Sequence, residues 1–333
     1  MTPRSLDEDD VRSRPSPRSR PRTRTRPRHD DAVDGVVLSV DRGRFGVLVD
    51  GRTVIAMRGG DMRRTPVVVG DDVSLVGDVS ASEGSLARIV RIGERRTVLR
   101  RSPDDDDPTE RVLVANADLL VIVTALAAPP PRPRLIDRIL VAAYDGGLSP
   151  LLCLTKSDLA PADDLLALYR PLGVDALTTT PDPDDPGVAE LRSRLAGRMS
   201  VLVGHSGVGK STLVNRLVPD ALRATGSVTS VDRGRHTSSS TVALPLPDGG
   251  WIIDTPGVRS FGLGLVDPEH LLRAFPDLYD AAQDCLRQCT HEAGDVECAI
   301  DVAIEAGRVG AARLESWRRL LDARRGTDDD QST

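Results

Sequence analysis

The residues with the clearest chemical meaning form the loop GHSGVGKS, from Gly204 to Ser211. The loop fits the pattern G-x-x-x-x-G-K-[ST], and it stands between an apolar segment, 199–203, and a helical segment, 211–217. In such loops the backbone N–H groups surround phosphate oxygens, the lysine reaches the outer phosphates and the final hydroxyl binds Mg²⁺. We predict a phosphate-binding loop here, and a glycine-rich turn is the alternative. The expected nucleotide contacts are Gly204, His205, Ser206, Gly207, Val208, Gly209, Lys210, Ser211 and Thr212.

A second group of residues, TKSD, ends the apolar segment LLCLTKSD and resembles the N-K-x-D motif of GTPases. In that motif the aspartate, here Asp158, accepts hydrogen bonds from two donors that only guanine presents, and Lys156 would pack its stem over the base. Thr155 stands where the motif has Asn, so we expect the loss of an amide that braces the phosphate loop. Nucleotide contacts are therefore predicted at Thr155, Lys156, Ser157 and Asp158, and a surface turn is the alternative.

The segment DTPG closes another apolar strand and predicts a third part of the site. Asp254 would reach Mg²⁺, and the amide of Gly257 would meet the γ-phosphate. Between this segment and the phosphate loop, the polar sequence GRHTSSS predicts a switch loop. In this loop Thr237, or its neighbour Ser238, would bind Mg²⁺.

A group that activates the attacking water is harder to assign. Val258 follows DTPG at the place where many GTPases hold water with glutamine. We predict His236 as its catalytic replacement, and a loop histidine with no catalytic role is the alternative.

Motif order is unusual, because TKSD precedes the phosphate loop by about fifty residues, whereas ordinary GTPases have the reverse order. The order of strands and helices predicts the same sheet cut after DTPG and rejoined elsewhere, a circular permutation that leaves the site intact. The second switch would then run directly into the C-terminal segment.

Three of the four cysteines crowd around one histidine near the C-terminus. Cys285, Cys289, His291 and Cys298 supply a complete tetrahedral ligand set, which predicts one structural Zn²⁺. Buried free cysteines are the alternative here. Cys153 lies within an apolar strand and is expected in the core.

Composition supports a multidomain protein of 333 residues that contacts a polyanion. Residues 11–28 hold eight arginines and no acid, which indicates a basic arm for RNA, or else a solubilising tail. Only two lysines occur, Lys156 and Lys210, and both lie inside the nucleotide motifs. No apolar run approaches a membrane span, so we expect a cytoplasmic protein without a membrane partner.

The predicted fold is a multidomain α/β chain: an OB-like β-barrel, a circularly permuted P-loop GTPase domain with a parallel sheet, and a helical zinc-binding segment. Five short strands between Gly35 and Leu99 predict the barrel. The expected divisions are a disordered arm (1–33), the barrel (34–100), a linker (101–110), the GTPase domain (111–264), the zinc-binding segment (265–322) and a disordered tail (323–333).

Together these motifs resemble the circularly permuted GTPases of the RsgA type, which depend on the small ribosomal subunit. The resemblance covers about residues 35–317, including VGDDV, RVLVANAD, GHSGVGKSTLVN, GRHTSSS, DTPGVRSFGL and the C-x-x-x-C-x-H tail. It implies GTP hydrolysis to GDP, stimulated by the 30S subunit late in its maturation, with the barrel and zinc segment on 16S rRNA. It also implies a monomer with Mg²⁺ and one Zn²⁺. Ser238 and Ser239 depart from a switch that is usually threonine-rich, and the cysteine spacings differ by one residue.

Two other functions compete with this one. An RNA-binding assembly factor could use GTP as a ligand with little turnover, and a general P-loop enzyme could use ATP. Competition between the two nucleotides, and GTP turnover with and without small subunits, would separate the three.

Overall fold

The computed structural model describes residues 29–62, 65–101, 111–218, 241–255, 263, 266–295 and 297–324. The chain divides into two units, residues 1–31 and residues 32–333. The second unit contains all the helices and strands named below. Most of the expected arm (1–33), linker (101–110) and tail (323–333), and the whole switch loop, lie outside the described residues. The described end of the arm includes Val33, the first residue of β1. Among the described helices, none combines the length and apolar character needed to cross a bilayer.

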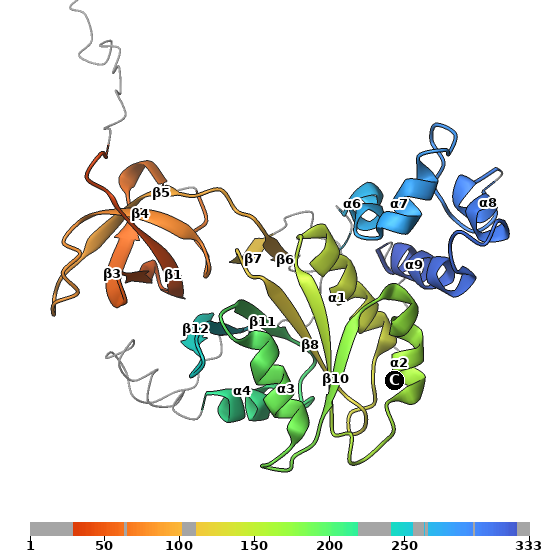
Figure 1. Ribbon diagram of the computed structural model, residues 1–333. Coiled ribbons are helices and arrows are strands. Elements are labelled where there is room, and N and C mark those ends of the chain that lie inside the picture. Colours follow the sequence, from red (N-terminus) through yellow and green to blue (C-terminus); the bar gives the residue numbers. More distant parts are fainter. Residues whose placement is uncertain are drawn as a thin grey trace, which may run out of the picture. The chain divides into compact units, whose positions relative to one another are not determined.

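Five strands form the N-terminal barrel, drawn in red and orange in Figure 1. They are β1 (Val33–Asp41), β2 (Arg44–Val49), β3 (Arg52–Arg58), β4 (Asp72–Gly77) and β5 (Ala87–Ile92). Their order, β1-β2-β3-β5-β4, closes because β1 also pairs with β4. Alternating side chains such as Val37, Phe45 and Ile89 fill the interior. The predicted five-stranded barrel is confirmed.

A separate two-stranded sheet, β6 (Val98–Arg101) with β7 (Arg111–Ala115), joins the barrel to the rest of the chain. The motif VGDDV packs directly on it, since Val69 bridges to Val114. Gly70 has φ +89°, and a Cβ there would lie 1.9 Å from the carbonyl oxygen of Ala115. The side-chain amide of Asn116 donates to the Gly70 carbonyl at 3.0 Å. Two motifs on which the resemblance rests therefore meet at one junction.

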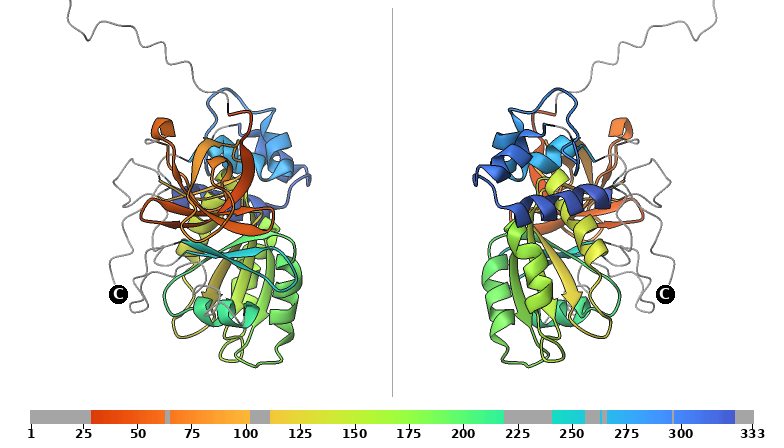
Figure 2. Two further views of the ribbon diagram at one scale, coloured as in Figure 1. Left: turned by 90° about the vertical axis from the view of Figure 1, so that its left-hand side faces the viewer. Right: turned by 90° about the vertical axis from the view of Figure 1, so that its right-hand side faces the viewer.

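The central sheet has the strand order β10-β9-β8-β11-β13-β12, and it continues into the barrel because β12 also pairs antiparallel with β1. Its strands are β8 (Leu119–Ala125), β9 (Ser149–Thr155), β10 (Asp175–Thr179), β11 (Met199–Val203), β12 (Val242–Pro245) and β13 (Trp251–Asp254). The first five in spatial order are mutually parallel, as predicted. The expectation of a purely parallel sheet is corrected at β12, which pairs antiparallel with β13. The short turn between these two strands leaves no room for a crossover helix, and Figure 2 shows the resulting hairpin in cyan.

Helices cover both faces of the central sheet, and alternate residues of β8 show this. Val121 and Val123 pack with α3 (Pro186–Leu195) and α4 (Lys210–Leu217). Leu120 and Ile122 pack instead with α1 (Pro133–Asp145) and α2 (Asp163–Tyr169), which leads into the short helix η3 (Arg170–Leu172). This double cover explains why the strands are continuously apolar, and Cys153 is fully buried in β9, as predicted.

The described C-terminal part is helical and packs on the α1 side of the sheet. It contains α6 (Pro268–Arg273), α7 (Pro276–Ala282), α8 (Ala299–Glu305) and α9 (Ala311–Arg324). Three arginines of α9 hold different partners. Arg313 pairs with Asp277 of α7, Arg318 with Asp301 of α8, and Arg319 with Asp137 of α1. Helix α9 thus ties the C-terminal part to the central domain.

Candidate nucleotide site and metal centre

The predicted nucleotide motifs gather where the parallel strands end. TKSD begins at the last residue of β9, the phosphate loop follows β11, and Asp254 is the last residue of β13. In open α/β sheets, ligands bind in the crevice beyond the carboxyl ends of the strands. The three motifs can therefore belong to one nucleotide site, although their order along the chain is permuted.

Glycines shape the phosphate loop because the backbone turns tightly against its neighbours. Gly207 and Gly209 have φ values of +82° and +96°, a region that side chains disfavour. A Cβ on Gly204 would lie 2.1 Å from the carbonyl oxygen of Val123. Helix α4 begins directly after Gly209, so its first N–H groups open into the loop. This arrangement can bind an anion.

Lys210 lies within the loop that precedes it. Its ammonium group donates to the carbonyl oxygens of Gly204 and His205, the latter at 2.9 Å. Burial lowers the pKa of Lys210, and the nearby Asp254 carboxylate opposes that shift. Burial likewise raises the pKa of Asp254, with Lys210 opposing. Lys210 and Asp254 are therefore close enough to interact electrostatically, and these are the two charged residue types that hold the phosphates and the divalent cation in such sites.

The TKSD segment touches the phosphate loop directly. The hydroxyl of Thr155 donates to the carbonyl oxygen of Val208 at 2.6 Å, and Lys156 Nζ donates to that of Gly207 at 3.1 Å. Lys156 Nζ also donates to the carbonyl of Ala128. Replacing Asn with Thr was expected to remove a brace on the phosphate loop, but the hydroxyl supplies one. The two motifs, about fifty residues apart in sequence, therefore form one continuous surface.

Asp158 is exposed at the tip of its loop, open to a ligand. The backbone N–H and hydroxyl of Ser157 both donate to the carbonyl oxygen of Thr179, at 3.2 and 3.3 Å. Thr179 ends β10, so the segment after it lies beside TKSD. The sequence did not indicate that the segment after Thr179, which begins at Thr180, belongs to the site. The one available sign was that this segment follows β10, the strand next to β9.

Asp254 has a support that sequence reasoning also missed. The hydroxyl of Thr255 is buried and donates to the carbonyl oxygen of Leu202 at 2.9 Å. This bond holds the end of β13 against β11, where Asp254 pairs with Leu202. The threonine of DTPG could have indicated such a role.

The remaining predicted nucleotide residues divide into two groups. Ser206, Ser211 and Thr212 are exposed or partly exposed, the last two in the first turn of α4. Gly257, Val258, His236, Thr237 and Ser238 lie outside the described residues, so their predicted roles stay predictions.

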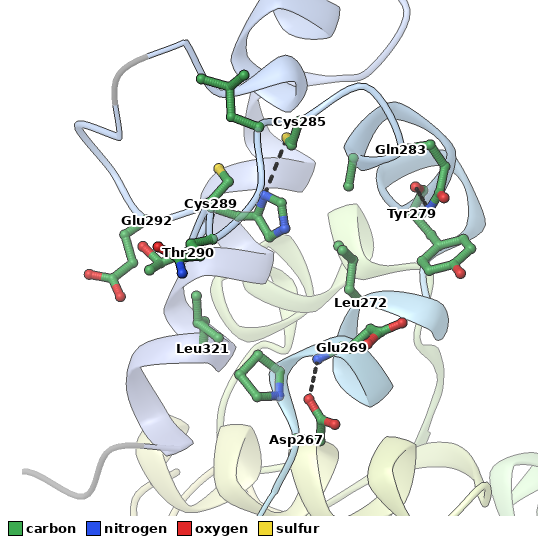
Figure 3. A pocket seen from close by; sticks show the side chains of 15 residues that line it. Asp267, Glu269, Leu272, Tyr279, Gln283, Cys285, Cys289, Thr290, Glu292 and Leu321 are labelled. Atoms are coloured by element: carbon green, nitrogen blue, oxygen red, sulfur yellow. Dashed lines mark hydrogen bonds between the residues drawn. The ribbon is translucent and has the colours of Figure 1, made fainter.

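Three cysteines and one histidine meet in the C-terminal part, as the sequence predicted. One ligand atom from each of Cys285, Cys289, His291 and Cys298 lies within 4.8 Å of all the others. Figure 3 shows the sulfur atoms of Cys285 and Cys289 near each other on one side of a pocket that Asp267 and Glu269 line on another.

The spacing of these atoms fits a tetrahedral zinc ion. Zinc bonds of about 2.3 Å to sulfur and about 2.05 Å to nitrogen place neighbouring ligand atoms about 3.6 Å apart. His291 Nδ1 lies 3.6 Å from the sulfur of Cys285 and 3.8 Å from that of Cys298. The backbone N–H of Ala299 donates to the Cys285 sulfur at 3.3 Å, a contact that orients this sulfur.

Neighbouring residues hold the ligand loop in shape. Gln288 and His291 have left-handed backbones, with φ of +73° and +60°. The hydroxyl and backbone N–H of Thr290 both donate to Asp295 at 2.8 Å. From α9, Arg318 donates to the carbonyl oxygen of His291 at 2.9 Å, so the ligand loop is fixed to that helix. The cluster therefore fits a structural metal site with four protein ligands.

Comparisons with known proteins agree with this geometry. A family model described as RsgA GTPase matches residues 92–264. The "Small ribosomal subunit biogenesis GTPase RsgA" of Chlorobaculum parvum is 37% identical over 266 residues, which cover 77% of this chain and 85% of that protein.

Two solved structures have a similar fold. The crystal structure of YjeQ from Thermotoga maritima matches with a TM-score of 0.65 and 25% identity, over 89% of this chain and 99% of that one. That of YloQ, described as a circularly permuted GTPase, matches with a TM-score of 0.62 and 23% identity, over 90% and 99% respectively, and this likeness concerns the fold alone. The permuted fold predicted from motif order is thus confirmed, and the chain belongs to the RsgA GTPase family.

Proposed function

We propose that this chain binds GTP at the carboxyl edge of its central sheet and hydrolyses it to GDP during biogenesis of the small ribosomal subunit. The observation that carries the proposal is the contact between TKSD and the phosphate loop through Thr155 and Lys156. This contact supports a shared pocket for guanine recognition and phosphate binding. The name of the Chlorobaculum relative, a GTPase of small-subunit biogenesis, supports the cellular process.

Each residue of the proposed pocket has a distinct role in binding the nucleotide. Asp158 accepts hydrogen bonds from the guanine edge, and Lys156 packs along the base. Lys210 leaves its two carbonyl partners to hold the outer phosphates, and the loop N–H groups bind the same oxygens. Ser211 and Asp254 would hold Mg²⁺, which neutralises charge on the phosphates when bound. We also propose Thr237 as a further ligand and His236 as the acceptor of the water proton.

In the C-terminal part, we propose that Cys285, Cys289, His291 and Cys298 hold one Zn²⁺ with a structural role. Four protein ligands leave no open position for substrate, so the metal does not take part in hydrolysis. Its binding would contribute to folding of a segment with short helices.

Contact with rRNA is proposed for the barrel, together with the arginine-rich arm. Residues 33–101 contain twelve arginines and nine acidic residues, whereas residues 266–324 contain seven arginines and twelve acidic residues. Arg42, Arg44, Arg52 and Arg88 are exposed on the barrel. The excess of arginines over acidic residues in the first segment supports its contact with phosphate backbones. Deleting residues 1–30 should weaken RNA binding and flatten its salt dependence, and an unchanged slope would remove the arm from the proposal.

The GTPase rate measured against added 30S subunits tests the function. We expect slow turnover alone, strong stimulation by the subunit and no nucleotide binding by Lys210→Ala. In Asp158→Asn, GTP should lose its advantage over ATP. Binding of GTP with no turnover at any subunit concentration would favour the assembly factor that uses GTP only as a ligand.

A further inference from the structure

A single arginine links the helix behind the phosphate loop to the segment beside the guanine motif. Arg216 lies in the last turn of α4 and donates from Nη1 to the carbonyl oxygen of Thr180 at 2.8 Å. Its Nη2 donates to the carbonyls of Asp182 and Pro183, the latter at 3.2 Å. Three carbonyls of one segment, 180–183, therefore converge on one guanidinium.

The segment 180–183 borders the guanine side of the pocket. Strands β9 and β10 are parallel with Thr155 opposite Thr179, so the residues after them leave the sheet side by side. Ser157 bonds to Thr179 through both its backbone N–H and its hydroxyl. A shift of 180–183 would therefore disturb the loop that carries Asp158.

The segment's shape and its position are set by different groups. Asp185 accepts hydrogen bonds from the backbone N–H groups of Thr180 and Gly187, at 2.8 and 3.0 Å, so the turn is organised internally. Arg216 comes from a separate element and sets only where that turn lies. A cation at a helix C-terminus is commonly placed to interact with that helix's own carbonyls. Here the guanidinium of Arg216 donates instead to three carbonyls of the other segment.

We propose that Arg216 is a positioning residue for guanine recognition, an inference that rests on the proposed function. It ties the base side of the pocket to α4, the helix that begins with Lys210. The side of the pocket that binds the base and the side that binds the phosphates are then held at a fixed distance from each other. The planar guanidinium spreads its donors over a fixed fork that can reach three carbonyls, whereas a lysine ammonium has all its donors on one nitrogen atom.

Binding of GDP and of inorganic pyrophosphate to the full chain, followed by calorimetry, tests the proposal. In Arg216→Ala we expect GDP to bind about tenfold more weakly while pyrophosphate affinity stays within about twofold. Arg216→Lys should fall between the parent and the alanine variant. Arg192→Ala is the matched control, because the Arg192 guanidinium donates to the backbone carbonyl of Arg216 rather than to segment 180–183.

Unchanged GDP affinity in Arg216→Ala would overturn the proposal. So would a parallel loss of GDP and pyrophosphate binding accompanied by a lower melting temperature, since that pattern means general destabilisation. Failure of the proposed function is distinct, because the parent protein itself would then not bind GDP.

Discussion

The ion pair between Arg319 of α9 and Asp137 of α1 gives a quantitative test of how the C-terminal part is held. Arg319 Nε lies 3.0 Å from Asp137 Oδ2, and its Nη2 donates to the carbonyl of Leu168 at 3.2 Å. Its guanidinium also lies 5.3 Å from the ring centre of Tyr169. The Asp137 side chain is 3% exposed and that of Arg319 31%. Replacing Arg319 with leucine therefore leaves a buried carboxylate without its cation.

Removing one member of a buried pair costs about 3 to 5 kcal/mol. Because Arg319 is partly exposed, water can enter after its removal, so we expect the lower limit, about 3 kcal/mol at pH 7. Urea unfolding in zinc-containing buffer, followed by the fluorescence of Trp251 and the buried Trp317, measures this loss of stability.

The loss should depend on pH in a defined direction. Burial raises the pKa of Asp137 above its ordinary 3.8, while Arg319 and Tyr169 lower it. Without Arg319 the folded-state pKa rises further, so the folded chain holds that proton more tightly than the unfolded chain. The variant's deficit should therefore be small near about pH 4 and grow as the pH rises and the carboxyl ionises.

A second substitution separates charge from packing. Asp137→Asn in the Arg319→Leu background removes the unpaired charge and should recover more than half of the lost stability. If the two substitutions instead add independently, or if the deficit is the same at every pH, the buried carboxylate is not the cause.

Three further predictions concern other contacts. Thr155→Val should weaken GDP binding about fivefold in a titration, because a buried carbonyl of the phosphate loop loses its donor, worth about 1 kcal/mol; Thr155→Ser should bind like the parent. Cys298→Ser should lower the zinc content, measured by mass spectrometry, below one per chain and weaken the near-ultraviolet tryptophan dichroism, because Trp317 packs on the imidazole of His291; retention of full zinc would exclude the proposed ligand set. Gly70→Ala should lower the free energy of unfolding by about 3 kcal/mol because its Cβ meets backbone, whereas Gly51→Ala, also at positive φ but in open space, should cost about 1 kcal/mol; equal losses in denaturant unfolding would contradict this.

Contiguous motifs were predictable because their chemistry needs neighbouring residues in a fixed order. Three such motifs could be recognised from the sequence alone: the phosphate loop from Gly204 to Ser211, the segment TKSD, and the spacing of the cysteines and histidine. Continuous apolar strands predicted a sheet covered on both faces, and motif order predicted the permutation. The antiparallel β12 was not predicted, since a four-residue apolar strand has no period that reveals the direction of its partner.

Contacts between distant segments needed the tertiary structure. Thr155 meets the carbonyl of Val208 across 53 positions, Arg216 meets Thr180 across 36, and Arg319 meets Asp137 across 182. Arginine is so common in this chain that no pattern marks these particular side chains. The sequence by itself determined which groups could bind phosphate, guanine and zinc, because those groups lie close together along the chain. Only the folded structure decided which side chains hold these groups in place, because a hydrogen bond depends on separation in space, which chain order does not specify.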